Sequence, residues 1–192
     1  MMQLFLIDNS ESMQQYKDDV IDAFTNLAHI LERADDDGLD VIFTSDWRKK
    51  EHARRTVDLV ELVQSNFPKD SAGQCLIENS LDDLITKIID DLPSGEVNRK
   101  SIASRAMSRL GKKTKGRPIS IYVLTNGVWN PSSRGGLCGA DAPIRRLIKE
   151  LQRRNLRRVQ VAFQFIRFGN NAMGIDRLTY LDDILGQEYP GL

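Results

Sequence analysis

The chain has 192 residues, and its 27 Asp and Glu side chains are balanced by 27 Lys and Arg side chains. That length suits one domain with a full hydrophobic core, and its apolar fraction of 41% is that of a globular rather than a disordered chain. Two cysteines without C-x-x-C spacing exclude a disulfide scaffold and argue against structural zinc. Because no apolar run approaches the ~18 residues that span a bilayer and no signal peptide is evident, we expect a cytoplasmic protein, or a domain of a longer one, that does not enter a membrane.

The balanced charge hides two halves of opposite sign. Residues 1–96 hold 21 Asp or Glu against 9 Lys or Arg, a net of −12, and residues 97–192 hold 6 against 18, a net of +12. Such asymmetry can create a basic face for an anionic partner. The simpler interpretation, which we favour, is that the two halves fold against each other and their charges intermix on one surface.

Strands and helices alternate along the first half. After a short buried strand, apolar residues at three- and four-residue steps predict an amphipathic helix that ends before Gly38. Residues 39–45 are rich in β-branched and aromatic side chains and predict a second strand. The charged residues 46–55 are expected to form a loop or a helix entry. Two further helices are predicted over residues 57–67 and 77–92, each followed by a proline.

The second half begins with a basic segment, residues 96–117, in which a short helix is expected around residues 101–110. Residues 119–124 predict a mostly apolar strand that ends in the polar turn 125–127. A long loop and a basic helix with a buried apolar stripe follow. Residues 159–166 alternate apolar with polar side chains, which indicates a strand near a sheet edge. A last helix is expected after this strand. The apolar stripe of the basic helix consists of Ile144, Leu147, Ile148 and Leu151, and that of the last helix of Leu178 and Leu181.

Strands that alternate with helices pair in parallel through right-handed crossovers. The sequence therefore predicts an α/β fold, doubly wound, with a mostly parallel central sheet and helices on both faces. We expect residues 1–192 to form one such domain.

Oxygen-bearing side chains follow the first strand at alternating positions. Asp8, Ser10 and Ser12 form a D-x-S-x-S motif, and Thr125 and Asn126 follow a later strand. Because the carboxyl ends of parallel strands lie at one edge of a sheet, the two loops can converge there. Carboxylate and hydroxyl oxygens are ligands that Mg2+ and Ca2+ prefer, so one interpretation is a divalent-metal site. The other is a helix N-cap, in which Ser10 or Ser12 satisfies the first amides of the next helix.

These motifs resemble those of a known family. Residues 8–13, Asp-Asn-Ser-Glu-Ser-Met, resemble the D-x-S-x-S signature of von Willebrand factor type A domains. Residues 124–127 are similar to the later T-D-G turn of that family, and residues 73–81 to the G-x-T-x-hydrophobic segment between them. The tail segments 164–169 and 181–185 are similar to fungal members. The resemblance covers essentially the whole chain and implies a Rossmann-like domain with a metal-ion-dependent adhesion site, where a metal bridges to an acidic group on a partner.

By this resemblance Asp8, Ser10 and Ser12 match the first three metal ligands of the family, and two other positions depart from it. Cys75 stands where the family has Thr, and its sulfur is a poor ligand for a hard cation. Asn126 stands where the family has Asp, and its neutral amide can still accept a hydrogen bond from a bound water. With one carboxylate in place of two, we expect Mg2+, or Ca2+ or Mn2+, to bind weakly or only together with a partner. The alternative is a vestigial site, in which Asp8 and the serines only connect the loops.

The function expected from these residues is a non-enzymatic protein-interaction module that binds an acidic side chain of a protein partner through the metal. No G-x-G-x-x-G, P-loop or G-x-S-x-G motif is present, and neither histidine lies near a candidate nucleophile. A phosphotransferase or hydrolase that uses a metal at Asp8 is the least favoured class. Cys138, in a Gly-rich loop, is either a reactive thiol or, as we favour, a free cysteine without a role in chemistry.

The alternative function is a metal-independent scaffold whose basic C-terminal half binds an acidic protein or nucleic acid. Its basic side chains lie in two tracts, residues 99–117 and 145–158. Nucleic acid ranks below protein because these tracts lack interleaved aromatic side chains for base stacking.

Overall fold

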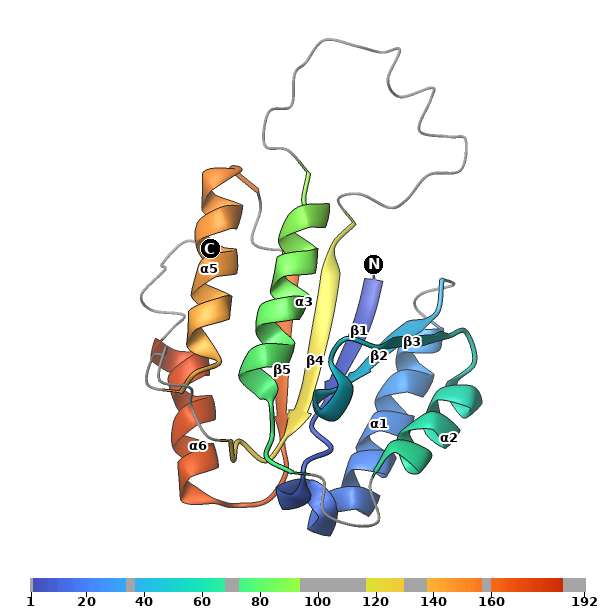
Figure 1. Cartoon of the computed structure of the whole chain (residues 1–192). Helices are drawn as coiled ribbons and strands as arrows, with labels where there is room; N and C mark the ends of the chain where they lie inside the picture. Colours follow the sequence, from blue (N-terminus) through green and yellow to red (C-terminus); the bar gives the residue numbers. More distant parts are fainter. Residues whose placement is uncertain are drawn as a thin grey trace.

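A five-stranded sheet runs through the described part of the molecule (Figure 1). The structure is a computed structural model that describes residues 2–33, 37–67, 73–93, 117–129, 138–156 and 160–184. The strand order is β3-β2-β1-β4-β5, and every neighbouring pair is parallel except β2 with β3. The strands are β1 (Met2–Ile7), β2 (Leu39–Phe43), β3 (Lys50–Ala53), β4 (Ile119–Thr125) and β5 (Val161–Arg167).

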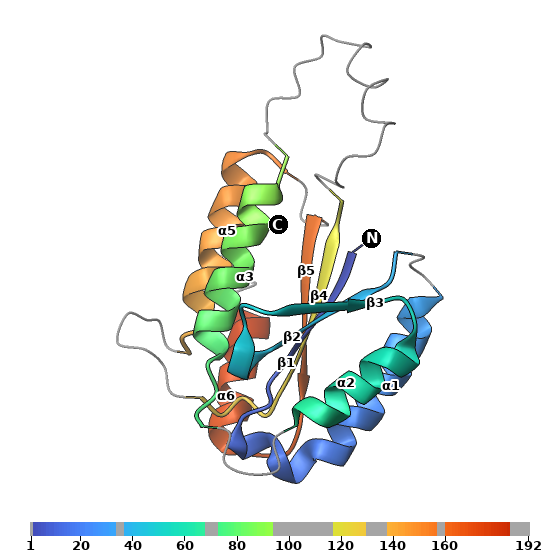
Figure 2. The same cartoon turned by 45° about the vertical axis from the view of Figure 1, so that its right-hand side comes forward.

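Helices cover both faces of this sheet, so the predicted doubly wound α/β fold is confirmed (Figure 2). Helices α1 and α2 pack on one face, and α3, α5 and α6 pack on the other. The helical elements are the 3-10 turn η1 (Glu11–Tyr16), α1 (Lys17–Glu32), the 3-10 turn η2 (Thr44–Asp46), α2 (Thr56–Asn66), α3 (Ile77–Asp91), α5 (Asp141–Arg153), α6 (Ala172–Thr179) and the π-helical turn η4 (Tyr180–Ile184).

The central strand β1 separates two hydrophobic cores. Leu4 and Leu6 belong to the core under α3 and α5, whereas Phe5 and Ile7 belong to the core under α1 and α2. The two pairs face opposite cores because successive side chains of a strand point to opposite faces of the sheet. Both faces of a parallel sheet are buried, so the strand is an unbroken apolar run. The ring of Phe5 stacks on Tyr122 of β4, with centroids 5.1 Å apart. Packing on both faces therefore holds β1 in place, and the loop that follows β1 starts from a fixed position.

Strand β3 is the main departure from the sequence-based prediction. Residues 46–55 were expected to be a loop or a helix entry, but Lys50–Ala53 pairs antiparallel with β2. Residue types there have low strand propensity, so the local sequence carries little signal. Instead, the buried Asp40 of β2 accepts hydrogen bonds from Lys50 Nζ at 2.9 Å and from His52 Nδ1 at 2.8 Å. A short charged strand also suits an edge, since it discourages pairing with other chains.

The other predicted elements lie close to their expected positions. The predicted helices 57–67 and 77–92 correspond to α2 and α3. Strand β5 pairs, among the described strands, with β4 alone, and Phe163 is half-buried while Gln164 is exposed, which confirms the expected edge position. The helix expected around residues 101–110 lies outside the described residues. No helix in the described ranges combines the length and apolar character needed to cross a bilayer.

Candidate functional site

The loops that follow β1 and β4 meet at the carboxyl edge of the sheet, the lower end in Figure 1. The backbone N–H of Asp8 donates to the carbonyl of Leu124 at 2.9 Å, and Thr125 Oγ1 donates to Asp8 Oδ2 at 2.8 Å. The prediction that the D-x-S-x-S loop and the 125–127 turn converge is therefore confirmed. The parallel pairing of β1 with β4 is what brings them together.

Asp8 is fully buried, with an exposed fraction of 0%. Its Oδ1 accepts hydrogen bonds from Ser10 N at 3.1 Å and from Thr44 Oγ1 at 3.5 Å, and its Oδ2 accepts from Thr125. Within the described ranges no Lys, Arg or His forms an ion pair with this carboxylate. A buried carboxylate is costly unless it is paired and hydrogen-bonded. The neutral donors orient Asp8 but do not cancel its charge.

Three neutral oxygens gather beside Asp8. Ser10 Oγ lies 3.2 Å from Ser12 Oγ, and Ser12 Oγ lies 3.5 Å from Asn126 Oδ1. Asn126 is held from both ends of its amide, because its Nδ2 donates to Ser12 O at 3.0 Å and its Oδ1 accepts from Val128 N at 2.9 Å. The structure therefore brings all four predicted site residues, Asp8, Ser10, Ser12 and Asn126, into one cluster.

The helix-cap interpretation of the serines is wrong for Ser10. Ser10 occupies the N-cap position of η1, yet its side chain makes no capping hydrogen bond. Its hydroxyl instead faces that of Ser12, which lies inside η1. The two hydroxyls therefore contact each other, and that of Ser12 also contacts Asn126.

Cys75 joins the cluster from the segment that precedes α3. It is buried, and it lines the same cleft as the two serines. Burial raises the pKa of the Cys75 thiol well above its usual value, and the neighbouring carboxylate of Asp8 raises it further. The thiol is therefore protonated at neutral pH. The turn around Cys75 lies at the same edge of the sheet, where Glu11 N donates to Gly73 O at 3.4 Å between the two loops.

A cleft of about 380 Å3 opens onto this cluster. Of the described residues that line it, none is basic, and Glu11 is the one that carries a carboxylate. The lining residues are Ser10, Glu11, Ser12, Gly73, Gln74, Cys75, Val128 and Trp129. Such a lining favours a cation over an anion, because an anion would meet only carboxylates and neutral dipoles.

Helix α6 supports the 125–129 loop, which the sequence did not predict. Arg177 Nη1 donates to Gly127 O at 3.1 Å and also to Trp129 O, and its guanidinium lies 5.1 Å from the centroid of the Trp129 ring. Burial lowers the pKa of Arg177, which is 9% exposed. The backbone of Gly174 packs so closely on Gly127 that a Cβ on Gly127 would lie 2.5 Å from its Cα. These contacts depend on tertiary packing, so no sequence motif predicts them.

Asn9 is a second residue that the sequence analysis missed. Its Nδ2 donates to Ser45 Oγ and to Asn66 O, both at 2.9 Å, and its Oδ1 accepts from Ser45 N at 3.1 Å. It therefore connects the loop after β1 to η2, which follows β2, and to α2. Its place inside the D-x-S-x-S motif was the available signal, but nothing in that motif distinguishes the intervening residues.

The oxygens of the cluster are spaced as a divalent cation requires, but few of the candidate ligands carry a negative charge. Two oxygens bound at right angles to one cation lie about 3.0 Å apart for Mg2+ and about 3.4 Å apart for Ca2+, given ligand distances near 2.1 and 2.4 Å. Ser10, Ser12 and Asn126 hydrogen-bond one another at oxygen separations of 3.2 and 3.5 Å, which are close to the spacing for Ca2+. However, no three His, Cys, Asp or Glu side chains of the described ranges gather at metal-binding distance. The candidate ligands are thus mostly neutral.

Cys138 lies at the start of α5, not among the residues that line the cleft. Its thiol donates to Asp141 Oδ1 at 3.7 Å. Burial, with the nearby carboxylate of Asp141, raises the pKa of Cys138 to about 12. A protonated, buried thiol is a poor nucleophile, which supports the interpretation of Cys138 as a free cysteine without a role in chemistry.

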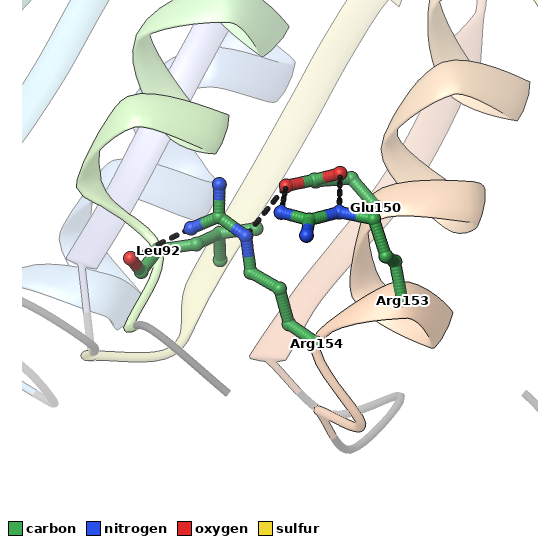
Figure 3. A network of polar contacts seen from close by, with 4 residues as sticks. All are labelled: Leu92, Glu150, Arg153 and Arg154. Atoms are coloured by element: carbon green, nitrogen blue, oxygen red, sulfur yellow. Dashed lines mark hydrogen bonds and ion pairs between the residues drawn. The ribbon is translucent and has the colours of Figure 1, made fainter. Parts of the chain in front are cut away.

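The described part of the basic half is largely paired with acidic groups (Figure 3). Glu150 accepts hydrogen bonds from Arg153 and Arg154, and Arg154 also donates to Leu92 O at 2.9 Å. Arg146 forms an ion pair of 3.1 Å with Asp82, so α5 is joined to α3 of the acidic half. Of these pairs, the one between Arg146 and Asp82 joins the two halves as the simpler interpretation expects, whereas Glu150, Arg153 and Arg154 all belong to the basic half.

No protein-family model matches the chain, and no curated protein matches its sequence.

Proposed function

We propose that this chain is a non-enzymatic protein-interaction module of the von Willebrand factor type A kind. In this proposal the cleft at the carboxyl edge of the sheet holds a divalent metal, through which the module binds an acidic side chain of a protein partner. The single observation that carries the proposal is the cluster of Ser10, Ser12 and Asn126 oxygens, spaced 3.2 and 3.5 Å apart beside the buried Asp8. The strand order of the sheet also supports the proposal.

Each residue of the cluster has a distinct task in this proposal. The two serines present hydroxyl oxygens to the cleft, Asn126 contacts Ser12 with its amide, and Asp8 supplies negative charge. Thr44 and Thr125 hold the two carboxylate oxygens of Asp8, so this charge is already oriented before any ligand arrives. When bound, Mg2+, Ca2+ or Mn2+ would supply the positive charge that a partner carboxylate needs, which the described lining of the cleft lacks.

The charge of the cluster predicts that metal and partner bind together. Asn126 is neutral and the Cys75 thiol is protonated, so Asp8 is the one charged side chain of the cluster itself. A partner carboxylate would supply the second negative charge that a divalent cation needs. Because such coupling is reciprocal, the metal should strengthen partner binding by the same factor by which the partner strengthens metal binding.

Binding is favoured over catalysis by the chemistry of the cleft. No histidine lines its described part, and the Cys75 thiol is protonated. An activated nucleophile is therefore not evident in the described lining of the cleft. We also propose that the module is cytoplasmic, since both cysteines of the chain are free thiols.

Calorimetric titration with Mg2+, Mn2+ and Ca2+, each with and without acetate as a probe for the partner carboxylate, tests this function. We expect weak metal binding that strengthens when acetate is present, and its loss in Asp8→Ala and Ser12→Ala. The exposed Ser65→Ala is a matched control that should leave metal binding unchanged. Absence of binding at millimolar metal with acetate, or unchanged binding in Asp8→Ala, would remove the metal from the proposal.

The metal-independent scaffold remains the second candidate, and the pairing of the α5 arginines reduces its basic surface. Strong, steeply salt-dependent retention on heparin would favour it, because polyanion binding releases counterions. We rank protein above nucleic acid as its partner.

A further inference from the structure

We propose that the open edge of β5, with the groove beside it, is a docking site for an extended segment of a partner protein. The segment would add a strand to the sheet and present apolar side chains at alternate positions to the groove. It would also carry a Lys or Arg that faces Asp182 and Asp183. This surface goes beyond the proposed function, because none of the described residues that line the groove also lines the metal cleft.

The two edges of the described sheet differ in length and in charge. Strand β3, at one edge, is four residues long and contains Lys50, Glu51 and His52. Short, charged edge strands discourage pairing with other chains. Strand β5, at the other edge, is seven residues long, and its one charged residue is Arg167 at its C-terminal end. A long, mostly apolar edge strand is a template on which another strand can form.

Strand β5 is paired on one side and, among the described strands, has no neighbour on the other. Its residues from Val161 to Arg167 pair in register with the residues of β4 from Ile119 to Thr125. A strand inside a sheet pairs on both sides, so the backbone groups of β5 that point away from β4 have no strand partner within the described ranges. An extended segment would supply those partners at a strand spacing of about 4.8 Å.

A groove of about 560 Å3 lies beside this edge and is lined by residues of β5, α5, α6 and η4. Phe163 and Phe165 of β5 line it with stacked rings, whose centroids are 6.4 Å apart, and Leu178 of α6 lines it as well. All three side chains are half-buried, so part of each apolar surface remains open. Phe163 and Phe165 are two positions apart and pack on the same core, so apolar side chains that alternate along an added strand would cover both.

The charges of the groove indicate which segment it would bind. Its described lining holds the carboxylates of Asp182 and Asp183 against the one guanidinium of Arg167, so it is net negative. Asp182 and Asp183 are exposed, and neither forms an ion pair with another residue of the described ranges. A Lys or Arg on the docked segment would supply that partner and fix the position of the segment along β5.

The position of α6 favours a single segment over a second copy of the chain. Both views place α6 on the side of β5 away from β4 (Figure 1, Figure 2). One added strand needs little width, whereas a second copy would bring its whole sheet and its helices against α6. Residues 185–192, which follow η4 in the sequence, contain one Glu and no Lys or Arg, so their charge does not complement Asp182 and Asp183. A basic, extended segment of another protein fits both observations.

The experiment adds a peptide of alternating residues, acetyl-Lys-Val-Thr-Val-Thr-Val-Thr-amide, to the isotope-labelled whole chain. We expect saturable binding, with the largest NMR shift changes at the amides of β5 and α6 and slower hydrogen exchange of the β5 amides. A peptide of the same composition without alternation, acetyl-Lys-Val-Val-Val-Thr-Thr-Thr-amide, should bind more weakly.

Charge reversal in the groove tests the basic residue of the segment. In the double variant Asp182→Lys and Asp183→Lys, affinity for the alternating peptide should fall about fivefold, the scale of an exposed ion pair. Replacing the lysine of the peptide with glutamate should restore binding to this variant. Asp176→Lys, an exposed change on α6 outside the groove, is the control and should leave peptide affinity unchanged.

Three results would overturn the proposal. Slow exchange of every β5 amide in the free protein would show that the edge is already paired, by another part of the chain or, if light scattering gives twice the mass, by a second copy. Shift changes confined to other elements would place the peptide elsewhere. Equal affinity for the two peptides would show that an added strand is not what the protein recognises.

This proposal and the metal-dependent function fail separately. The peptide should bind equally in Mg2+ and in EDTA, because the groove and the cleft share no described lining residue. Peptide binding that requires Mg2+ would place the peptide at the cleft and overturn the docking site. Absence of metal binding would remove the metal from the proposed function and leave the docking site standing.

Discussion

The hydroxyl of Thr125 donates a 2.8 Å hydrogen bond to the carboxylate of Asp8, although 117 positions separate them in the sequence. Thr125 is the last residue of β4, and Asp8 follows the last residue of β1. Thr125 Oγ1 also accepts from Gly127 N at 3.1 Å. One side chain therefore orients both the buried carboxylate and the turn that carries Asn126.

We predict that Thr125→Val lowers the free energy of unfolding by about 1–3 kcal/mol, the cost of leaving a buried polar group without its partner. Valine keeps the shape of threonine, so the change isolates the hydroxyl. Denaturant unfolding followed by circular dichroism measures it. The exposed Thr179→Val on α6 is the control and should change stability by less than about 0.5 kcal/mol. Equal losses of unfolding free energy at the two positions would show that the hydrogen bond to Asp8 does not stabilise the fold.

The second prediction concerns Arg177. Replacing it with Met removes the donors for Gly127 O and Trp129 O while keeping much of the apolar volume. Because hydrogen bonds from charged donors contribute more than neutral ones, we expect a loss of about 2–3 kcal/mol. The tryptophan emission spectrum should shift, since the guanidinium lies over Trp129. Arg153→Met, whose side chain is 68% exposed, should leave the emission spectrum unchanged; a spectral shift there as well would contradict the assignment to Trp129.

The third prediction concerns acid stability. Hydrogen bonds from Arg153, with those from Arg154, lower the pKa of Glu150 from 4.5 to about 2. A carboxyl group with a lowered pKa in the folded state contributes stability above its unfolded pKa and loses that contribution as pH falls through the folded value. The melting-temperature advantage of the wild type over Glu150→Gln should therefore be complete above pH 4.5 and shrink between pH 4.5 and 2.

Thermal melts of the wild type and of Glu150→Gln at closely spaced pH values measure this advantage. An advantage over Glu150→Gln that stays constant down to pH 2 would contradict the role of the two arginines.

The fold could be predicted from the sequence where the local pattern and the tertiary contacts agree. The apolar run of β1 and the apolar stripe of α3 can each be buried in one orientation only. The ends of both elements were predicted within one or two residues. Strand β3 could not be predicted, because the contacts of Asp40 with Lys50 and His52 stabilise a segment of low strand propensity. Local sequence does not contain those contacts.

The candidate site divides in the same way. Asp8, Ser10 and Ser12 lie within five residues and could be identified as a motif, and the parallel sheet explains why Asn126 joins them. Arg177 and Asn9 were missed because their roles depend on carbonyl and amide groups of distant segments. A single Arg in an amphipathic helix, or an Asn inside a motif, gives no sign of what it will contact.

The last prediction exchanges stability for metal affinity at Asn126. In Asn126→Asp the donors to Ser12 O and Ser12 Oγ are lost, and a carboxylate oxygen then faces the Ser12 carbonyl. Without metal we expect a loss of about 1–3 kcal/mol, because a buried polar contact becomes repulsive. A second carboxylate should also tighten Mg2+ binding at least tenfold, so Mg2+ should raise the melting temperature of the variant far more than that of the wild type. Asn66→Asp, an exposed change that adds the same charge, controls for net charge and should gain nothing from Mg2+. If Mg2+ stabilises neither variant, the oxygens of Ser10 and Ser12 are not metal ligands, and the cluster only connects the two loops.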